Sequence, residues 1–289
     1  MKTFSFPVTS AVLMLLLAVG CTSTYKPVIL VHGVLSGPSS FKTLTGFIKK
    51  AHPGTEVTAI DLFNNENSTK SMWEQIDGFA KVTQEIMEKS PEGVHLLCYS
   101  QGGLICRGVL SKLPNHNVQN FIALSSPLAG QYGVPDYLRN TFFLGIKSVY
   151  VWCYGLLKYF SVCNYWNDPH HHKEYLEYNK FLPLLNGEKT HSEMAEWKKN
   201  FLRIKKLVLI GGPDDDVITP WQSSHFGFYN NKESIIEMKK QNFYKKNPFG
   251  LKTLDTRGDL IVCTQSGVKH VEWHSNLSVF EKCIQKWLD

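Results

Sequence analysis

The chain has 289 residues, of which 43% are hydrophobic, and a net charge of +6. This composition is sufficient for a substantial buried core and argues against a globally disordered chain. Lys and Arg occur at most two in a row, as at Lys49-Lys50 and Lys245-Lys246, so the spread-out charge argues against nucleic-acid binding.

The N-terminal segment is typical of a secretory signal peptide, which we place at residues 1–21. Lys2 is followed by the apolar run Ala11–Gly20, which ends in small residues. The sequence AVGC at Ala18–Cys21 also resembles a lipoprotein cleavage site, which is a minor alternative to a secretory signal peptide. The run is too short for a membrane span, and Lys147 interrupts the later stretch TFFLGIKSVYVWCYGLL, so we expect no stable membrane span.

Apolar runs alternate with amphipathic segments along much of the chain. Strands are predicted at Pro27–Val31, Val57–Leu62, Val94–Tyr99, Asn120–Pro127, Leu207–Gly211 and Leu260–Cys263. Helices are predicted at Ser39–Ala51, Ser71–Lys89, Gly102–Leu113 and Ser275–Trp287. Apolar strands alternating with helices indicate an α/β fold, with a mostly parallel central sheet and helices on both faces. We expect one such domain over residues 25–289.

The alternation stops between about residues 128 and 200, where the sequence is aromatic and irregular. An inserted helical cap fits this segment, and its aromatic side chains serve either as ordinary core or as an apolar wall for an acyl chain. The run His170-His171-His172 also lies here. Consecutive histidines point in different directions and no Cys or Glu cluster has metal-ligand spacing, so we expect no metal and no cofactor.

The stretch CYSQGG at Cys98–Gly103 indicates a nucleophile elbow, in which Ser100 lies between a buried strand and a helix. Two glycines after the serine allow the helix to pack closely. The pattern G-x-S-x-G is only partly matched, because Cys98 occupies the first glycine position. A disulfide to Cys106 would link the strand to the first turns of the helix and hold the elbow.

A serine hydroxyl needs a general base, and in this type of fold the order along the chain is Ser, acid, His. The acid is expected in Asp214-Asp215-Asp216, just after a strand. We choose Asp215, although spacing alone does not select it from its neighbours. The base is expected in GVKHVEWHSN after the last strand, where we choose His270 and interpret His274 as structural.

Stabilising a tetrahedral oxyanion requires two backbone N–H donors. We expect one from Gln101, which follows the nucleophile. We expect the other from Val34, in the loop VHGVLSG after the first strand, where Gly33 allows the backbone to come close.

Six of the seven cysteines follow residue 21, and an even number after a signal peptide suggests three disulfides rather than free cytosolic thiols. Pairing sequence neighbours is the simplest of about 15 connectivities. It predicts Cys98–Cys106, Cys153–Cys163 and Cys263–Cys283. In a secreted chain, Asn67-Ser68-Thr69 and Asn276-Leu277-Ser278 would be glycosylation sites at Asn67 and Asn276.

The segments YKPVILVHGV, GVHLLCYSQGGLICR, ALSSP, CNYWNDPHH and LVLIGGPDDDVITPWQSS together resemble the palmitoyl-protein thioesterases, from about Tyr25 to the C-terminus. The resemblance implies an α/β-hydrolase fold with the triad Ser100, Asp215 and His270. It implies hydrolysis of fatty acyl thioesters, including acyl-CoA, and also N-glycosylation and delivery to lysosomes.

Two alternatives remain from the residues alone. One is an oxoester lipase or carboxylesterase on the same fold, and the other is an inactive hydrolase-fold protein that binds acyl chains or a partner. The sequence does not indicate acyl-CoA rather than acyl-protein as the substrate, nor an oligomeric state.

Overall fold

The computed structural model describes residues 25–133, 146–155 and 159–289, so the predicted signal peptide lies outside the described residues. Six strands form one sheet in the order β2-β1-β3-β4-β5-β8, and every neighbouring pair is parallel. These strands are β1 (Val28–Val31), β2 (Val57–Ala59), β3 (Val94–Tyr99), β4 (Val118–Leu124), β5 (Lys206–Gly211) and β8 (Leu260–Thr264). Each corresponds to a predicted strand, with ends that differ by up to three residues.

The apolar strands supply two cores because successive side chains of a strand point to opposite faces of the sheet. In β1, Ile29 and Val31 belong to one core, while Val28 and Leu30 belong to the other. All four side chains are almost fully buried. A strand covered on both faces has no polar side, which explains its continuous run of apolar residues.

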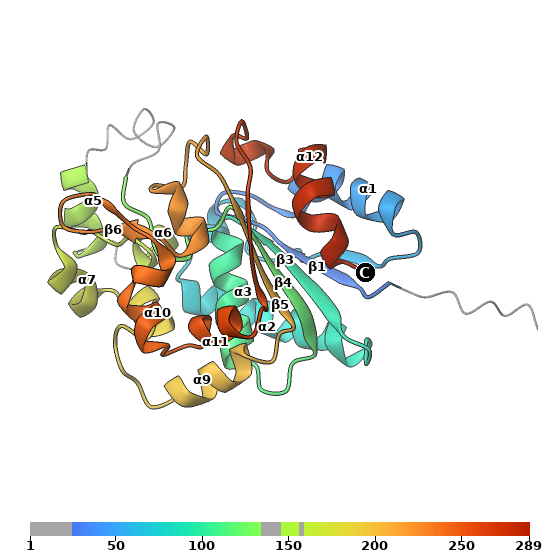
Figure 1. The fold of residues 1–289 in the computed structure, drawn as a ribbon, viewed down its shortest axis with the longest axis horizontal. Coiled ribbons are helices and arrows are strands. Elements are labelled where there is room, and N and C mark those ends of the chain that lie inside the picture. The colour runs from blue at the N-terminus through green and yellow to red at the C-terminus, as the bar shows by residue number, and fades with distance from the viewer. Residues whose placement is uncertain (1–24, 134–145, 156–158) are drawn as a thin grey trace, which may run out of the picture.

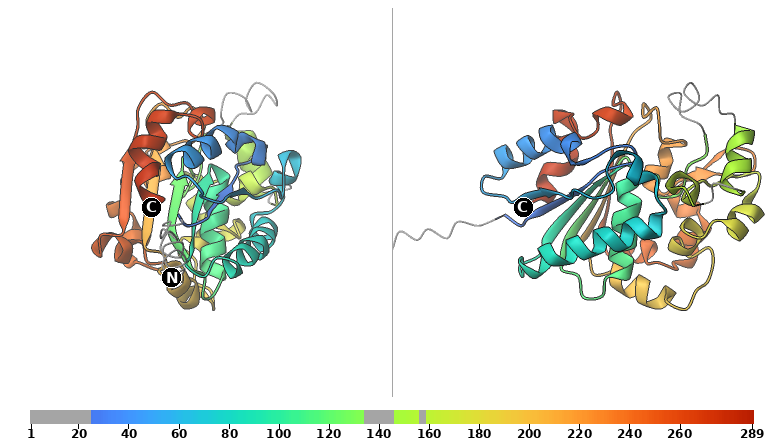
Figure 2. Two further views of the ribbon diagram at one scale, coloured as in Figure 1. Left: turned by 90° about the vertical axis from the view of Figure 1, so that its right-hand side faces the viewer. Right: turned by 180° about the vertical axis from the view of Figure 1, so that it is seen from behind.

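Helices cover both faces of this sheet, as Figures 1 and 2 show. On one face, α1 (Lys42–Ala51) packs through Leu44 and Ile48 beside the C-terminal segment. On the other face lie α2 (Met72–Glu88) and α3 (Gln101–Lys112). The sheet is therefore the middle layer of three.

The C-terminal segment differs from the single helix predicted at Ser275–Trp287. It consists of the short helix α12 (Leu277–Val279), a π-helical turn at Phe280–Ile284 and a 3-10 turn at Gln285–Trp287. Cys283 is bonded to Cys263 of β8, and the neighbouring apolar side chains are buried against the sheet. Packing of these side chains on the sheet, together with the covalent link to β8, holds the segment in this irregular form.

The predicted cap region, residues 128–200, contains short helices and includes 134–145 and 156–158, which are outside the described residues. The described helices are α5 (Ile146–Cys153), α6 (Ser161–Asn164), α7 (His172–Tyr178), α8 (Leu182–Leu185) and α9 (Met194–Phe201). Figures 1 and 2 show α5, α6 and α7 beyond one end of the sheet. We call α5–α8 the cap helices. By contrast, α9 packs against α3, where Asn200 Nδ2 donates to the carbonyl of Ser111 at 3.0 Å.

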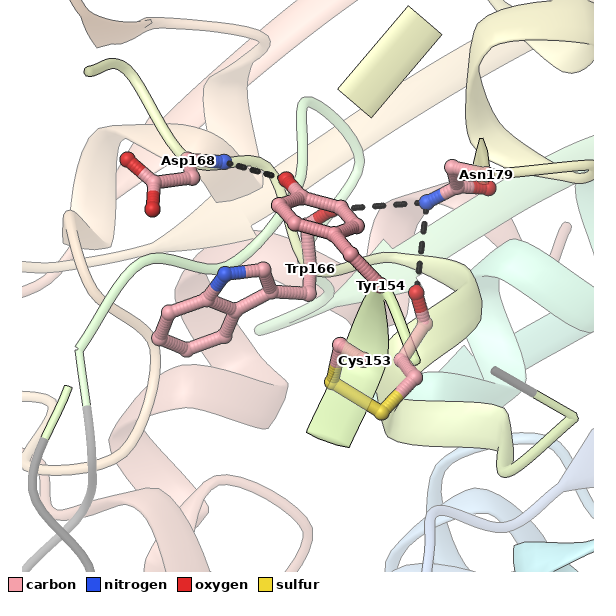
Figure 3. Close-up of a disulfide and its surroundings, with 6 residues drawn as sticks. Cys153, Tyr154, Trp166, Asp168 and Asn179 are labelled. Atoms are coloured by element: carbon pink, nitrogen blue, oxygen red, sulfur yellow. Dashed lines mark hydrogen bonds between the residues drawn. A yellow bond between two sulfur atoms is a disulfide. The ribbon is translucent and has the colours of Figure 1, made fainter. Parts of the chain in front are cut away.

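Two of the cap helices, α5 and α6, are linked by the Cys153–Cys163 disulfide (Figure 3). Beside it, the Asn179 side-chain amide donates to the carbonyls of Cys163 and Trp166, each at 3.3 Å. The hydroxyl of Tyr154 accepts from the backbone N–H of Asp168 at 3.4 Å. Short helices have little intrinsic stability, so these cross-links supply part of the order of the cap.

A second segment, between β5 and β8, joins the cap, and the sequence did not predict it. It contains the antiparallel pair β6 (Phe228–Tyr229) and β7 (Ile235–Ile236), followed by α10 (Asn242–Lys246) and α11 (Leu251–Thr256). Glu233, in the turn between β6 and β7, lies 2.8 Å from His170 Nε2. We call this stretch the second cap segment, because it contacts the region predicted as the cap.

His95 of β3 is a buried basic group that should make stability depend on pH. Its side chain is 1% exposed, and neither ring nitrogen has a hydrogen-bond partner within the described residues. Burial, with the nearby positive charges of Lys26, His52 and Lys205, lowers its pKa from 6.5 to about 4. The unfolded chain therefore binds more protons than the folded chain between these pH values, and stability falls as the pH drops through that window.

We expect the free energy of unfolding to fall by up to about 3 kcal/mol through His95 between pH 6.5 and pH 4. His95→Leu, which removes the titrating group at similar volume, should therefore be more stable than the wild type at pH 5 and show a smaller slope. Urea unfolding at several pH values measures this. An unchanged slope in the variant would show that His95 does not carry the effect.

Candidate active site

Ser100 lies at the junction of β3 and α3, in a backbone conformation that is rare for a residue with a side chain. Its φ is 54° and its ψ is −128°. Such a conformation costs about 1–3 kcal/mol and persists only where the surroundings impose it. Here the Ser100 N–H donates to the carbonyl of Leu124 at 2.9 Å, which ties the turn to the end of β4. The hydroxyl thus projects beyond the carboxyl edge of the sheet.

Three glycines allow the chain to close around this turn. A Cβ on Gly102 would overlap the carbonyl oxygen of Val31, and one on Gly103 would overlap the side chain of Ser126. A Cβ on Gly33 would lie 2.8 Å from the Cβ of Ser100, closer than side-chain atoms tolerate. The loop after β1 therefore lies directly against the nucleophile candidate.

A disulfide joins Cys98, the fifth residue of β3, to Cys106 in α3. Both cysteines are almost fully buried. Cys98 pairs with Ala123 of β4 in parallel register. The disulfide spans the turn that holds Ser100, in the place expected from the sequence. The other two bonds, Cys153–Cys163 and Cys263–Cys283, also join sequence neighbours.

The structure brings together the three predicted triad residues. His270 Nε2 lies 2.9 Å from Ser100 Oγ, and His270 Nδ1 lies 2.9 Å from Asp215 Oδ2. The His270 side chain is 8% exposed and that of Asp215 is 1% exposed. A hydroxyl, an imidazole and a buried carboxylate in this order are the arrangement used for nucleophilic catalysis by serine.

Both carboxylate oxygens of Asp215 accept several hydrogen bonds. Oδ1 accepts the backbone N–H groups of Val217 and Ile218, each at 2.9 Å. Oδ2 accepts from Trp273 Nε1 at 2.8 Å and from the hydroxyl of Ser125. Burial raises the pKa of Asp215, but the interactions with His270 and the other donors outweigh burial and hold the pKa below its ordinary value. The group is therefore an ionised carboxylate that faces the imidazole.

The neighbours of Asp215 have different partners. Asp214 Oδ2 accepts the N–H of Gly267 at 2.7 Å, and Asp216 Oδ1 accepts the N–H of His270 at 3.0 Å. Both therefore position the loop that carries His270 without touching its ring. The three aspartates are distinguished only by the direction in which the loop turns each side chain, which spacing does not encode.

His270 is positioned through its backbone and its ring. The Tyr99 hydroxyl donates to the His270 carbonyl at 2.8 Å, and the two rings are 5.1 Å apart. His274, interpreted as structural, packs edge-on against Tyr99 with ring centres 4.8 Å apart. Burial, followed by the charge of His270, lowers the pKa of His274.

Gln101 and Val34, the predicted oxyanion donors, lie on the two sides of Ser100. Gln101 is the first residue of α3, where a backbone N–H has no acceptor within the helix. Val34 follows Gly33, which touches Ser100. Their role as oxyanion donors stays a prediction.

Two histidines of the run His170-His171-His172 pair with acidic side chains. His170 pairs with Glu233, and His171 Nδ1 lies 3.0 Å from Asp168 Oδ2. Within the described part of the chain, no group of three or more His, Cys, Asp or Glu residues could hold a metal ion.

Sequence reasoning missed several residues that contact the triad, chiefly Ser125, Trp273 and Tyr99. Ser125 follows β4 directly and has a φ of 46°. Its position at the end of a predicted central strand was the one feature of the sequence that could have indicated a role in the site. Trp273 is a buried aromatic residue and Tyr99 belongs to β3, so in the sequence both resemble ordinary core residues. Their hydrogen bonds depend on contacts between distant segments.

The chain from residue 27 to residue 270 matches the family model described as palmitoyl protein thioesterase. This chain belongs to that family. Lysosomal thioesterase PPT2 of Rattus norvegicus is 52% identical over 267 residues, which cover 92% of this chain and 88% of the relative. Lysosomal thioesterase PPT2-B of Xenopus laevis is 52% identical over 278 residues, covering 95% and 96% of the two chains.

The solved structure of a putative aryl esterase from Burkholderia cenocepacia is 11% identical in sequence to this chain, with a TM-score of 0.50. The alignment covers 91% of this chain and 89% of the esterase chain. At this identity the likeness concerns the fold alone. The parallel sheet, the elbow and the helical layers are those of an α/β-hydrolase.

Proposed function

We propose that the chain is a serine hydrolase that cleaves S-acyl thioesters with Ser100 as nucleophile. The observation that carries the proposal is the continuous hydrogen-bonded chain from Ser100 Oγ through His270 to Asp215. The palmitoyl protein thioesterase family supports fatty acyl thioesters as the substrate class, with palmitoyl-CoA and S-palmitoylated peptides as members of that class.

In the proposed reaction, Ser100 Oγ attacks the thioester carbonyl carbon while His270 Nε2 takes the hydroxyl proton. Asp215 holds the other ring nitrogen and stabilises the imidazolium that forms. The N–H groups of Val34 and Gln101 bind the oxyanion. The C–S bond then breaks, and the sulfur leaves as a thiol with the proton from His270. Water, activated by His270, hydrolyses the acyl-enzyme to release the fatty acid and restore Ser100.

The cap helices reach the nucleophile, which supports a role in holding the acyl chain. The hydroxyl of Tyr165, at the end of α6, donates to Oε1 of Gln101 at 3.2 Å, one residue from Ser100. Tyr132 packs against Trp166 and Tyr229, so aromatic side chains from both cap segments meet. We assign this aromatic cluster to the wall of the acyl site.

A paired-substrate measurement tests the function. We expect a higher kcat/KM for palmitoyl-CoA than for a palmitoyl oxoester of an aliphatic alcohol, because a thiolate is a better leaving group than an alkoxide and depends less on protonation by His270. S-palmitoylated peptide is the third substrate, and a serine-directed fluorophosphonate reports nucleophile content. Equal or faster cleavage of the oxoester would favour a lipase or carboxylesterase. Absence of both labelling and turnover would favour a binding protein.

Entry into the secretory pathway and delivery to lysosomes are also part of the proposal. They are supported by the names of the relatives, which are called lysosomal thioesterases. Asn67 is exposed, and Asn276 is half-buried with its side-chain oxygen accepting the N–H of Val279 at 3.2 Å. We therefore expect a glycan first at Asn67. An unchanged mass after endoglycosidase treatment of the chain expressed in animal cells would contradict this.

Among the described residues, none of the helices combines the length and the apolar character needed to cross a bilayer.

A further inference from the structure

Ser68 is a fully buried serine that lies between the loop after β1 and the start of α3. It belongs to the 3-10 turn Asn65–Thr69, between β2 and α2. Its hydroxyl accepts the backbone N–H of Leu35 at 2.6 Å and donates to the carbonyl of Asn65. Both hydrogen-bonding functions of the hydroxyl are therefore used within the interior.

The carbonyl of Ser68 collects donors from three other elements. It accepts from Gln75 Nε2 of α2 at 2.9 Å, from Gln101 Nε2 of α3 at 2.8 Å and from Ser161 Oγ of α6 at 3.0 Å. Each of these three side chains is at most 1% exposed. A buried polar network in which every member is satisfied is rigid, because each broken bond leaves an unpaired polar group.

On the loop side, Ser68 fixes a strained turn. Leu35 has a φ of 53° although it carries a branched side chain that is half exposed, so its own packing does not impose this conformation. The hydrogen bond from its N–H to Ser68 does so, together with the N–H of Asn65, which donates to the carbonyl of Ser36 at 2.7 Å. Leu35 directly follows Val34, one of the two proposed oxyanion donors.

On the helix side, Ser68 fixes Gln101, the other proposed donor. The Gln101 amide donates to the Ser68 carbonyl and to Gln75 Oε1 at 3.3 Å, and its oxygen accepts from Tyr165. A side chain held at all its polar atoms fixes the residue that carries it, and hence the direction of its backbone N–H.

We infer that Ser68 is a positioning residue for the oxyanion site: its hydroxyl holds the Val34–Leu35 turn and its carbonyl holds Gln101, so one residue sets the spacing of the two N–H donors. None of the hydrogen bonds of Ser68 described above is made to a residue of the triad. The inference rests on the proposed function. Donors must lie about 2.7–3.1 Å from the developing oxyanion, so a small displacement of either one weakens transition-state binding without weakening substrate binding.

The test is Ser68→Ala in the full chain. This change removes the hydroxyl and keeps the carbonyl, and the glycosylation sequon at Asn67 survives because its middle position accepts any residue except proline. We expect kcat to fall about 10- to 100-fold with KM nearly unchanged, because losing one oxyanion donor outright costs about 10²- to 10³-fold. Affinity for a long-chain trifluoromethyl ketone, which forms a tetrahedral adduct with Ser100, should fall by a similar factor. Affinity for the S-alkyl thioether of CoA, which lacks the carbonyl, should not change.

The matched control is Ser111→Ala. Ser111 is also a buried serine, and its hydroxyl donates to the carbonyl of Arg107 within α3 at 2.9 Å, away from the elbow. This variant should keep the wild-type kinetics. Gln101→Met, which keeps the backbone N–H but not the link to Ser68, tests the same connection from the helix side and should show the same split between kcat and KM.

The inference is overturned if Ser68→Ala behaves like Ser111→Ala, or if it weakens the ketone and the thioether equally, which is the pattern of a purely structural defect. Each measurement is made with both a thioester and an oxoester. A wild type that cleaves only the oxoester would reject the proposed substrate class, while the comparison between Ser68→Ala and Ser111→Ala would still decide the role of Ser68.

Discussion

Ser100→Ala is expected to lower kcat for palmitoyl-CoA by about 10⁴- to 10⁶-fold, the range seen when the nucleophile of a serine triad is removed. The hydroxyl lies 2.9 Å from His270 Nε2 at the tip of the turn, and no other hydroxyl is hydrogen-bonded to that nitrogen in the described residues. Without it, His270 has no nucleophile to activate, and only the oxyanion donors and substrate binding remain to accelerate attack by water.

The same change should leave the fold intact. Alanine adopts the backbone conformation of Ser100 at about the same cost as serine, and the lost hydrogen bond is worth about 1 kcal/mol. The melting temperature and the affinity for the S-alkyl thioether of CoA should therefore stay close to those of the wild type. Ser111→Ala controls for the loss of a buried hydroxyl. Turnover of the Ser100→Ala enzyme above background, or labelling of it by a fluorophosphonate, would reject Ser100 as the nucleophile.

The main layers of the fold could be predicted because they depend on local patterns. Strands such as β1 and β3 are apolar on both faces, and α2 carries a clear apolar stripe, so periodicity alone locates them. The elbow was visible for the same reason, since a serine and two nearby glycines between a strand and a helix form a local signal. Parallel strands then bring their carboxyl ends to one edge, which predicts the meeting of Ser100, Asp215 and His270.

What could not be predicted depends on contacts between distant segments. The second cap segment, with β6 and β7, has strands of only two residues, too short to show a periodicity. The C-terminal helix changes its hydrogen-bonding pattern because Cys283 is tied to β8. The inferred role of Ser68 depends on hydrogen bonds from four segments to this one residue. In the sequence, Ser68 is only the middle residue of a glycosylation sequon.

Asp215→Asn is expected to lower kcat about 10³- to 10⁴-fold, close to the loss known for the corresponding change in serine proteases. The reason lies in the donors around the carboxylate. Oδ1 faces two backbone N–H groups, so the oxygen of an asparagine amide must stay there. The NH2 group would then point at Trp273 Nε1–H and at His270 Nδ1. His270 could accept from that NH2 only with the proton on Nε2, the tautomer that cannot accept the proton of Ser100.

The neighbouring aspartates supply matched controls for the loss of one negative charge. Asp214→Asn keeps an oxygen that can accept the N–H of Gly267, and Asp216→Asn keeps one for the N–H of His270. Neither changes the tautomer of the imidazole, so both should retain kcat within about 10-fold of the wild type, because only one exposed or part-buried hydrogen bond is altered.

The pH profile provides a further check on Asp215. Its pKa is held below the ordinary value, so the carboxylate loses its charge at a lower pH than an ordinary aspartate does and should not set the acid limb of the wild-type profile. If Asp214→Asn or Asp216→Asn were as inactive as Asp215→Asn, the charge of the whole loop would matter rather than one carboxylate. If Asp215→Asn retained near-normal kcat, the hydrogen bond between Asp215 and His270 would have no part in catalysis, and the triad would be reduced to Ser100 and His270.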